Sequence, residues 1–286
     1  MKILLLGIFF VCLNTFTGSS FDAITKYLSI NNYKWYHYYS IGGTAAIILF
    51  ILLFFTNGEI KKHLTLKNKN HFYFLILRGI SFIPVLLIVF YSLKYIPISL
   101  FATLIMTSPF FLLIFAKIIL KEKLNYISWV AILIGFCGVL IVLRPSLSNI
   151  NIFIFLVFFA VLIISFNFTI VSKYSHIATS YGFTFYQYLP ITLFAYIFFI
   201  FDPLVPSLKE FILFSSAGVL MMISMWAWNK AYHIAGKYSS IISPFFFTQI
   251  IWGSLYGIIF FSEELSLISI IGVIVIVISG TIAIYN

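Results

Sequence analysis

Polar side chains recur at helical spacing within the apolar stretches of this sequence. Asn14, Thr17 and Asp22 share one face of the first stretch, and Lys26 lies one turn beyond Asp22. A polar group that faces hydrocarbon is costly, so such a face predicts either a cavity wall or a polar contact between helices. For this stretch we favour a cavity wall, with close helix packing as the alternative.

Later stretches add further candidates for solute binding. Trp226 and Asn229 lie one turn apart, and Gln249, Trp252 and Tyr256 share a face by i, i+3, i+7 spacing. Aromatic rings attract cationic or aromatic solutes, and a buried amide needs a partner or a ligand. For Gln249, solute contact and a partner in a neighbouring helix are equally supported. The predicted binding set is completed by Tyr91, Thr107 and Asn167.

Three charged residues in apolar stretches are candidates for coupling or gating: Asp22, Lys26 and Arg78. Asp22 and Lys26 are one turn apart, so an ion pair is the simpler interpretation and proton coupling the alternative. Arg78 is interpreted as orienting its helix at the membrane interface, with attraction of an anion as the alternative. Glu122 and Glu263 are interpreted as helix-end groups in water.

The sequence lacks patterns typical of enzymes and metal sites. Its five histidines do not cluster at metal-ligand spacing, and zinc-protease, nucleotide-binding and serine-hydrolase motifs are absent. We therefore expect neither enzymatic activity nor a cofactor or metal. The net charge of +10 does not indicate nucleic acid, because the lysines fall mainly in short loops, as in membrane proteins.

The elements that position these residues are predicted to be membrane-spanning helices. Hydrophobic residues make up 63% of the 286 positions and charged residues 8%, whereas a soluble domain carries about 25% charged residues. The apolar runs are long and do not alternate, which favours helices over barrel strands. Polar breaks predict ten spans: 3–27, 36–56, 72–93, 97–119, 126–143, 151–173, 180–201, 210–232, 238–261 and 266–285.

The two halves of the sequence carry related features. A shift of 141 positions superimposes identical residues, namely Thr107, Glu122, Leu124, Ile127 and Ser128 on Thr248, Glu263, Leu265, Ile268 and Ser269. We expect an all-α integral membrane protein of ten transmembrane helices, with two five-helix repeats at 1–145 and 146–286. Repeats with odd numbers of spans insert with inverted topology, an arrangement typical of alternating-access transporters. Cleavage of the first span as a signal peptide would break this repeat.

Lysine and arginine predict the orientation. With the N-terminus inside, twelve of these residues fall on the inner side and five on the outer side. Cytoplasmic loops of membrane proteins carry this excess, so both termini are expected in the cytoplasm.

Several motifs resemble those of the drug/metabolite transporter superfamily, specifically its EamA-type members. The resemblance rests on Arg78-Gly79, Leu93–Pro97, Leu120–Leu124 and Arg144-Pro145 in the first half, and on Ser243–Phe245, Gln249–Trp252 and Phe261–Glu263 in the second. It implies a ten-helix carrier of the cell inner membrane with a central cavity between the halves, and no single substrate. The chain departs from many relatives at His37, where they carry an arginine.

These features predict a transporter of a small metabolite that works by alternating access. An aromatic cavity with Asp22 nearby favours an amino-acid-like or cationic solute such as S-adenosylmethionine. The expected partners are the solute and the lipid bilayer, in a monomer or homodimer that binds no nucleic acid. The alternative is a non-transporting membrane protein, either an enzyme on a lipid-linked substrate or a subunit of a membrane complex, in which loop residues such as Glu122 are essential.

Overall fold

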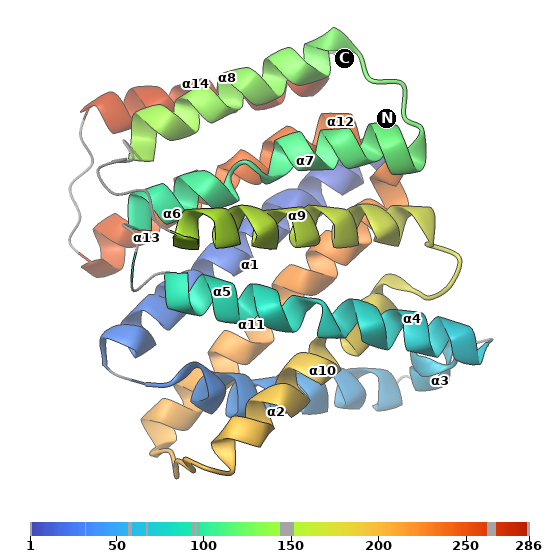
Figure 1. The fold of residues 1–286 in the computed structure, drawn as a ribbon, viewed down its shortest axis with the longest axis vertical. Helices are drawn as coiled ribbons and strands as arrows, with labels where there is room; N and C mark the ends of the chain where they lie inside the picture. Colours follow the sequence, from blue (N-terminus) through green and yellow to red (C-terminus); the bar gives the residue numbers. More distant parts are fainter. Residues whose placement is uncertain are drawn as a thin grey trace.

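The chain is described by a computed structural model over residues 2–31, 33–56, 59–66, 68–92, 95, 98–143, 152–261 and 267–284. These residues form helices and connecting turns, with no strand among them. Figure 1 shows long helices stacked side by side, with α1 and α11 crossing the stack obliquely. Eight segments of the described chain are long and apolar enough to cross a membrane, and Leu267–Ala283 is a shorter apolar helix.

The first half contains α1 to α8. Their bounds are Lys2–Ile30, Trp35–Thr56, Ile60–Leu64, Lys69–Ile80, Phe82–Ser92, Ile98–Ile105, Ser108–Phe115 and, after a π-helical turn at Ala116–Leu120, Tyr126–Leu143.

The second half contains α9 to α14. Their bounds are Ile152–Lys173, Ser180–Phe199, Leu208–Ala235, Ser239–Ile242, Thr248–Phe261 and Leu267–Ile284. Short 3-10 segments at Gly236–Tyr238 and Ser243–Phe247 flank α12.

Two predicted spans are interrupted in the structure. A proline lacks the backbone N–H, and its ring clashes with the carbonyl four residues earlier. The residue four positions before Pro84 is Ile80, where α4 ends, and the residue four positions before Pro109 is Ile105, where α6 ends. The predicted spans 72–93 and 97–119 are therefore each two helices in sequence.

The eighth and ninth predicted spans lie within one long apolar stretch, Leu208–Phe260. Ten separate spans thus remain a prediction, whereas an all-helical protein with many apolar helices is confirmed. The predicted repeat boundary at 145 and 146 lies outside the described residues, as do Arg144 and Glu263.

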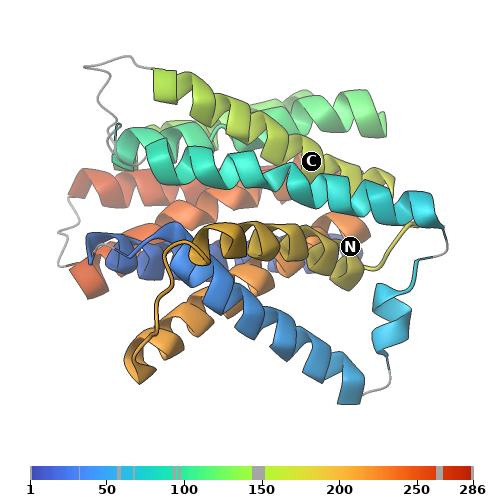
Figure 2. The same ribbon diagram turned by 60° about the horizontal axis from the view of Figure 1, so that its bottom comes forward.

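Helices from the two halves pack against one another. α1 packs along α11, α8 lies along α14, and α2 contacts both α10 and α11. α9 of the second half packs on α5 and α7 of the first. In Figure 2, α2 and the start of α11 cross the bundle obliquely on the side turned forward. The halves therefore share one core, and a site between them draws on residues far apart in the sequence.

The crossing of α2 and α11 depends on two glycines. A Cβ atom built on Gly218 would lie 2.0 Å from the Gly42 carbonyl oxygen, and one on Gly42 would lie 2.1 Å from the Phe214 carbonyl oxygen. Only a residue without a side chain permits this backbone contact. Small residues let helices approach closely within a membrane, where apolar burial drives association weakly.

Large apolar side chains are exposed on the outside of the bundle. Phe9, Phe159 and Ile274, on α1, α9 and α14, are each more than half exposed. The interior holds aromatic residues such as Trp228 and Phe247 that are almost fully buried. An apolar outer surface over a packed core is what a lipid environment requires.

Candidate functional site

The first candidate site lies where α1 meets α13. The Gln249 side-chain amide donates a hydrogen bond to Asp22 Oδ2 at 3.2 Å, and Ser19 Oγ donates to the Gln249 backbone oxygen at 3.2 Å. The Asp22 side chain is exposed. An exposed carboxylate against hydrocarbon is costly, so this face of α1 is suited to water or a polar solute.

Aromatic side chains continue the same contact. The Trp252 ring packs edge to face on Phe16, with centroids 5.2 Å apart, and the Tyr256 hydroxyl lies 2.6 Å from Ser20 Oγ. Trp252 Nε1 is buried and has no hydrogen-bond partner among the described residues. A buried N–H normally has an acceptor, so this donor is available to a ligand. We call this set of residues 16, 20, 22, 249, 252 and 256 the α1–α13 seam.

The α1–α13 seam combines groups that recognise an aromatic metabolite. The rings offer stacking and edge contacts, the indole N–H donates, and the amide and carboxylate accept. Lys26, one turn from Asp22, is half-buried. No group of histidine, cysteine or acidic side chains that would hold a metal ion occurs in the described part of the chain.

The second candidate site is a buried polar network around Arg78. The guanidinium donates to Gln187 Oε1 at 3.0 Å and to Asn229 Oδ1 at 2.9 Å. Its Nε donates to the Asn167 backbone oxygen at 3.4 Å, and the Asn229 amide donates to Thr184 Oγ1 at 3.0 Å. We call these five residues the Arg78 network; it joins α4 of the first half to α9, α10 and α11 of the second.

The Arg78 side chain is only 5% exposed. Within the described residues no carboxylate lies at ion-pair distance from it, so its charge is compensated by neutral oxygens and by the Phe82 and Phe183 rings, whose centroids lie 5.8 and 5.5 Å from Cζ. The interpretation of Arg78 as an orienting residue at the membrane interface is therefore wrong. The reason is that Gln187 and Asn229 supply acceptors inside the protein, so the side chain does not have to reach water.

Other predicted binding residues contact neighbouring helices or their own backbone. The Asn14 amide donates to the Ser224 backbone oxygen at 3.0 Å and to Ser224 Oγ at 2.8 Å, which ties α1 to α11. The Thr17 and Thr107 hydroxyls donate to the carbonyls of residues 13 and 104 in the preceding turn, at 2.8 and 2.6 Å. For Asn14 and Thr17 these contacts fit the close helix packing that was the alternative interpretation of the first apolar stretch.

Trp226 and Tyr91 lie apart from both sites. The Trp226 ring stacks on Tyr181 at 5.3 Å and meets Phe10 edge to face at 5.4 Å. Tyr91, at the end of α5, is 43% exposed. The structure thus divides the predicted set between the α1–α13 seam, the Arg78 network and helix contacts, while solute binding by any of these residues stays a prediction.

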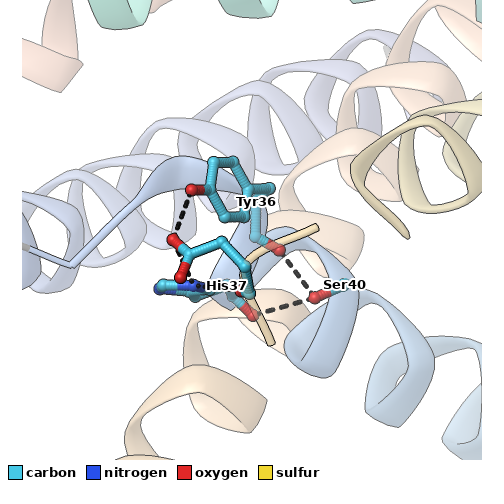
Figure 3. Close-up of polar contacts among 4 residues, drawn as sticks. Tyr36, His37 and Ser40 are labelled. Atoms are coloured by element: carbon cyan, nitrogen blue, oxygen red, sulfur yellow. Dashed lines mark hydrogen bonds and ion pairs between the residues drawn. The ribbon is translucent and has the colours of Figure 1, made fainter. Parts of the chain in front are cut away.

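A third polar cluster lies at the start of α2. The Tyr36 hydroxyl donates to Asp202 Oδ2 at 2.6 Å, and His37 Nε2 lies 3.0 Å from the Asp202 backbone oxygen and 3.5 Å from its Oδ2. In Figure 3 Tyr36 and His37 approach the same carboxylate, while Ser40 donates back to the backbone of α2. Beside it, a hydrogen bond from Tyr33 to Glu210 raises the pKa of the tyrosine hydroxyl.

We call the contacts of Tyr33, Tyr36 and His37 with Asp202 and Glu210 the α2 clamp. It connects the first half to the segment around the start of α11. Sequence reasoning missed it, because spacing along a helix carries no information about a carboxylate 165 residues away. The available signal was a run of Tyr and His at a span end, together with Asp202 in the polar break between the predicted spans 180–201 and 210–232.

The long apolar helices and their packing define a multi-pass membrane protein. Residues 5–144 match the model of the EamA-like transporter family, which confirms the resemblance seen in the motifs of this part of the chain. The riboflavin transporter of Vibrio cholerae serotype O1 is 32% identical over 151 residues.

That match covers 52% of this chain, and the chain spans 50% of the relative's length. A solved crystal structure of another protein superimposes with a TM-score of 0.76 and 14% identity, over 99% of this chain and 96% of the other. At that identity the likeness shows a common fold.

Proposed function

We propose that this protein transports a small metabolite across the cell inner membrane by alternating access, with ten helices in two inverted five-helix repeats at 1–145 and 146–286. The packing of helices supports the repeat. If α9 is matched to α1, and α10 to α2, then α11 corresponds to α4 with α5, α13 to α7, and α14 to α8. The contacts of α1 with α11 and α13 then correspond to those of α9 with α5 and α7. Likewise, α2 with α11 corresponds to α10 with α4.

The proposed orientation has both termini in the cytoplasm. It rests on the excess of lysine and arginine in the loops assigned to the inner side. In this orientation the Arg78 network lies toward the cytoplasm and the α2 clamp lies toward the outside.

We propose the α1–α13 seam as the solute site. The observation that carries this proposal is an exposed carboxylate, Asp22, bonded to Gln249 beside the unpartnered indole N–H of Trp252. α1 and α13 belong to different halves, so movement of one half against the other changes the geometry of this site. That coupling of solute contact to conformation is what alternating access requires.

The Arg78 network and the α2 clamp are proposed as the inner and outer gates. Each joins residues of the first half to residues of the second by hydrogen bonds. Opening one side requires its bonds to break while those on the other side hold. Two sets of bonds that break in turn give two states separated by a modest free energy, as a transporter needs.

The solute is proposed to be a planar heteroaromatic metabolite. Support comes from the aromatic and amide groups of the α1–α13 seam and from the relative named as a riboflavin transporter. A flavin ring offers carbonyl acceptors to the Trp252 N–H and one imide N–H donor to the Asp22 carboxylate. The competing solute is cationic, such as S-adenosylmethionine, for which Asp22 supplies the countercharge.

Uptake into proteoliposomes tests the proposal. Purified protein should accumulate riboflavin, and a panel of S-adenosylmethionine and amino acids tests the competing class. Accumulation of any of these solutes above the level in empty vesicles supports transport. The solute that is taken up fastest identifies the solute class. If no solute accumulates with the protein inserted in either orientation in the vesicle membrane, the protein does not transport these classes of solute. The non-transporting alternative is then favoured.

Asp22→Asn separates the two solute classes. Loss of a countercharge should reduce uptake of a cationic solute by about tenfold or more, because a charge-assisted hydrogen bond contributes about 1.5–3 kcal/mol. Uptake of a neutral flavin should fall by less than about threefold, since the amide keeps one acceptor. The measurement is initial uptake rate under subsaturating solute.

The control for this experiment is Gly253→Ala on α13. A Cβ at Gly253 meets no atom within 4 Å, so this variant should transport as the wild type does. Equal loss of both solutes in Asp22→Asn would contradict a solute-contacting role and indicate a structural one.

A further inference from the structure

A cavity of about 720 Å³ opens in a part of the protein that shares no residue with the α1–α13 seam. Its walls come from residues 119–123 and 125 after α7, from Ser172 and Lys173 at the end of α9, and from residues 236–238, 240 and 241 between α11 and α13. Both halves of the chain therefore contribute to the cavity. By the proposed orientation it faces the cytoplasm.

The cavity walls are strongly basic. Its lining contains the exposed lysines Lys121, Lys123, Lys173 and Lys237. Among the described residues, none of these ammonium groups lies at ion-pair distance from a carboxylate. Several cations without ion-pair partners around one hollow attract a multiply charged anion more strongly than scattered surface lysines do.

The single acidic residue of the lining, Glu122, is already engaged. Its Oε2 accepts a hydrogen bond from Ser239 Oγ at 2.6 Å, and its Oε1 accepts from the Ser240 N–H at 3.2 Å and from the Ser240 hydroxyl. Glu122 is thus not a helix-end group directed to water, as its position in a loop had suggested, because the start of α12 folds over it. It connects the halves, and among the described residues it forms no ion pair with a lysine of the lining, so four cations there face one carboxylate.

One of these lysines, Lys121, has a strained backbone conformation. Lys121 has φ 56, the left-handed region, and its N–H bonds the Ala116 carbonyl at the end of the π-helical turn. Glycine is the usual residue in this conformation at a helix end, because a side chain is strained there. The chain instead carries a lysine at the cavity wall. Strain at a cavity is an observation that points toward function.

We propose that this cavity binds a phosphate group, carried either by the head group of an anionic phospholipid or by a soluble phosphorylated molecule. Lysine ammonium groups bind phosphate as compact point charges. Basic pockets between helices on the cytoplasmic side of membrane proteins bind anionic head groups. The lining also contains Ile119, Leu120 and Ile241, which give an apolar border to the basic centre. A phosphate bound here holds the two halves together at this end.

The test variant is Lys121→Gly combined with Lys173→Gln and Lys237→Gln. Glycine relieves the left-handed backbone, so the fold is expected to tolerate the change. The matched control is Lys209→Gln, which removes a lysine near the start of α11, outside the cavity lining. Lys121→Gly alone removes one cation while easing strain, and it serves when the triple variant does not fold.

Two arms distinguish the sources of phosphate. Purified protein in detergent is titrated with inorganic pyrophosphate against sodium chloride of equal ionic strength, and thermal unfolding is followed. In parallel, nanodiscs of phosphatidylcholine with and without phosphatidylglycerol are compared by the same measurement. Ligand that binds the folded state raises the melting temperature by mass action.

The wild type and Lys209→Gln should be stabilised in at least one arm, and the triple variant should bind at least about tenfold more weakly, since each lost cation weakens attraction to phosphate. A response to phosphatidylglycerol alone identifies a lipid site, and a response to pyrophosphate alone identifies a soluble ligand. Absence of stabilisation of the wild type in both arms, or equal stabilisation of wild type and lysine-depleted variants, overturns the proposal.

Discussion

Arg78→Met is expected to reduce solute uptake by at least about tenfold, equivalent to 1.4 kcal/mol, while the melting temperature stays within a few degrees of the wild type. Methionine removes the hydrogen bonds of the guanidinium and also the cost of burying its charge. Replacement of a buried ion pair by apolar residues of similar volume is often close to neutral for stability. Here the partners of the lost charge are neutral amides, and Gln187 Oε1 keeps the Asn229 amide as a donor. Loss of the bonds to Gln187 and Asn229 would nevertheless remove the proposed inner gate.

Asn229→Leu, in contrast, should destabilise the folded protein. It leaves the Arg78 charge buried with one acceptor fewer, and such a change costs roughly 3 kcal/mol. The measurement is thermal unfolding in detergent, with uptake in proteoliposomes alongside. The double variant Arg78→Met, Asn229→Leu should be more stable than Asn229→Leu alone, because the uncompensated charge is then gone.

Other results would exclude the gate. If Arg78→Met fails to fold while the double variant also fails, the Arg78 network is required for assembly of the helices. If Arg78→Met folds and transports at the wild-type rate, the network has no part in the transport cycle. Either outcome leaves the α1–α13 seam open to its own test.

Gly218→Ala is expected to destabilise the folded protein by about 3 kcal/mol or more, at the upper end of the range for overpacking. The added Cβ would lie 2.0 Å from the Gly42 carbonyl oxygen, and backbone atoms cannot rotate aside as a side chain does. α11 would have to separate from α2 along the crossing, which opens packed surface and shifts both proposed gates. We therefore expect little folded protein and a matching loss of uptake.

Gly253→Ala is the control, because its Cβ has open space around it. Thermal unfolding and the yield of monodisperse protein in detergent measure the effect. Gly42→Ala should resemble Gly218→Ala, since its Cβ would lie 2.1 Å from the Phe214 carbonyl oxygen. Wild-type stability of both variants would mean that the α2–α11 crossing adapts easily and does not depend on glycine.

The membrane class of this protein, its helices and the EamA resemblance of its first half followed from the amino-acid sequence. The composition of a segment and the length of its apolar run determine whether it lies in lipid or in water. Both properties can be read from the residues of that segment alone. Helical spacing also selected Asp22, Gln249 and Trp252 as polar or aromatic positions on helix faces. The prolines that end α4 and α6 were present in the sequence too, but their effect became visible only where the helix breaks were seen.

The partners of the polar residues were decided by the tertiary structure alone. Spacing along a helix predicts which side chains share a face, but the neighbour that covers that face depends on how distant helices pack. Arg78 lies at the centre of a buried network because Gln187, 109 positions away, supplies an acceptor for its guanidinium. Glu122 connects the halves because Ser239 folds over it, 117 positions away. Packing between the halves thus determined which of the predicted residues form a seam, which form a buried network and which hold helices together.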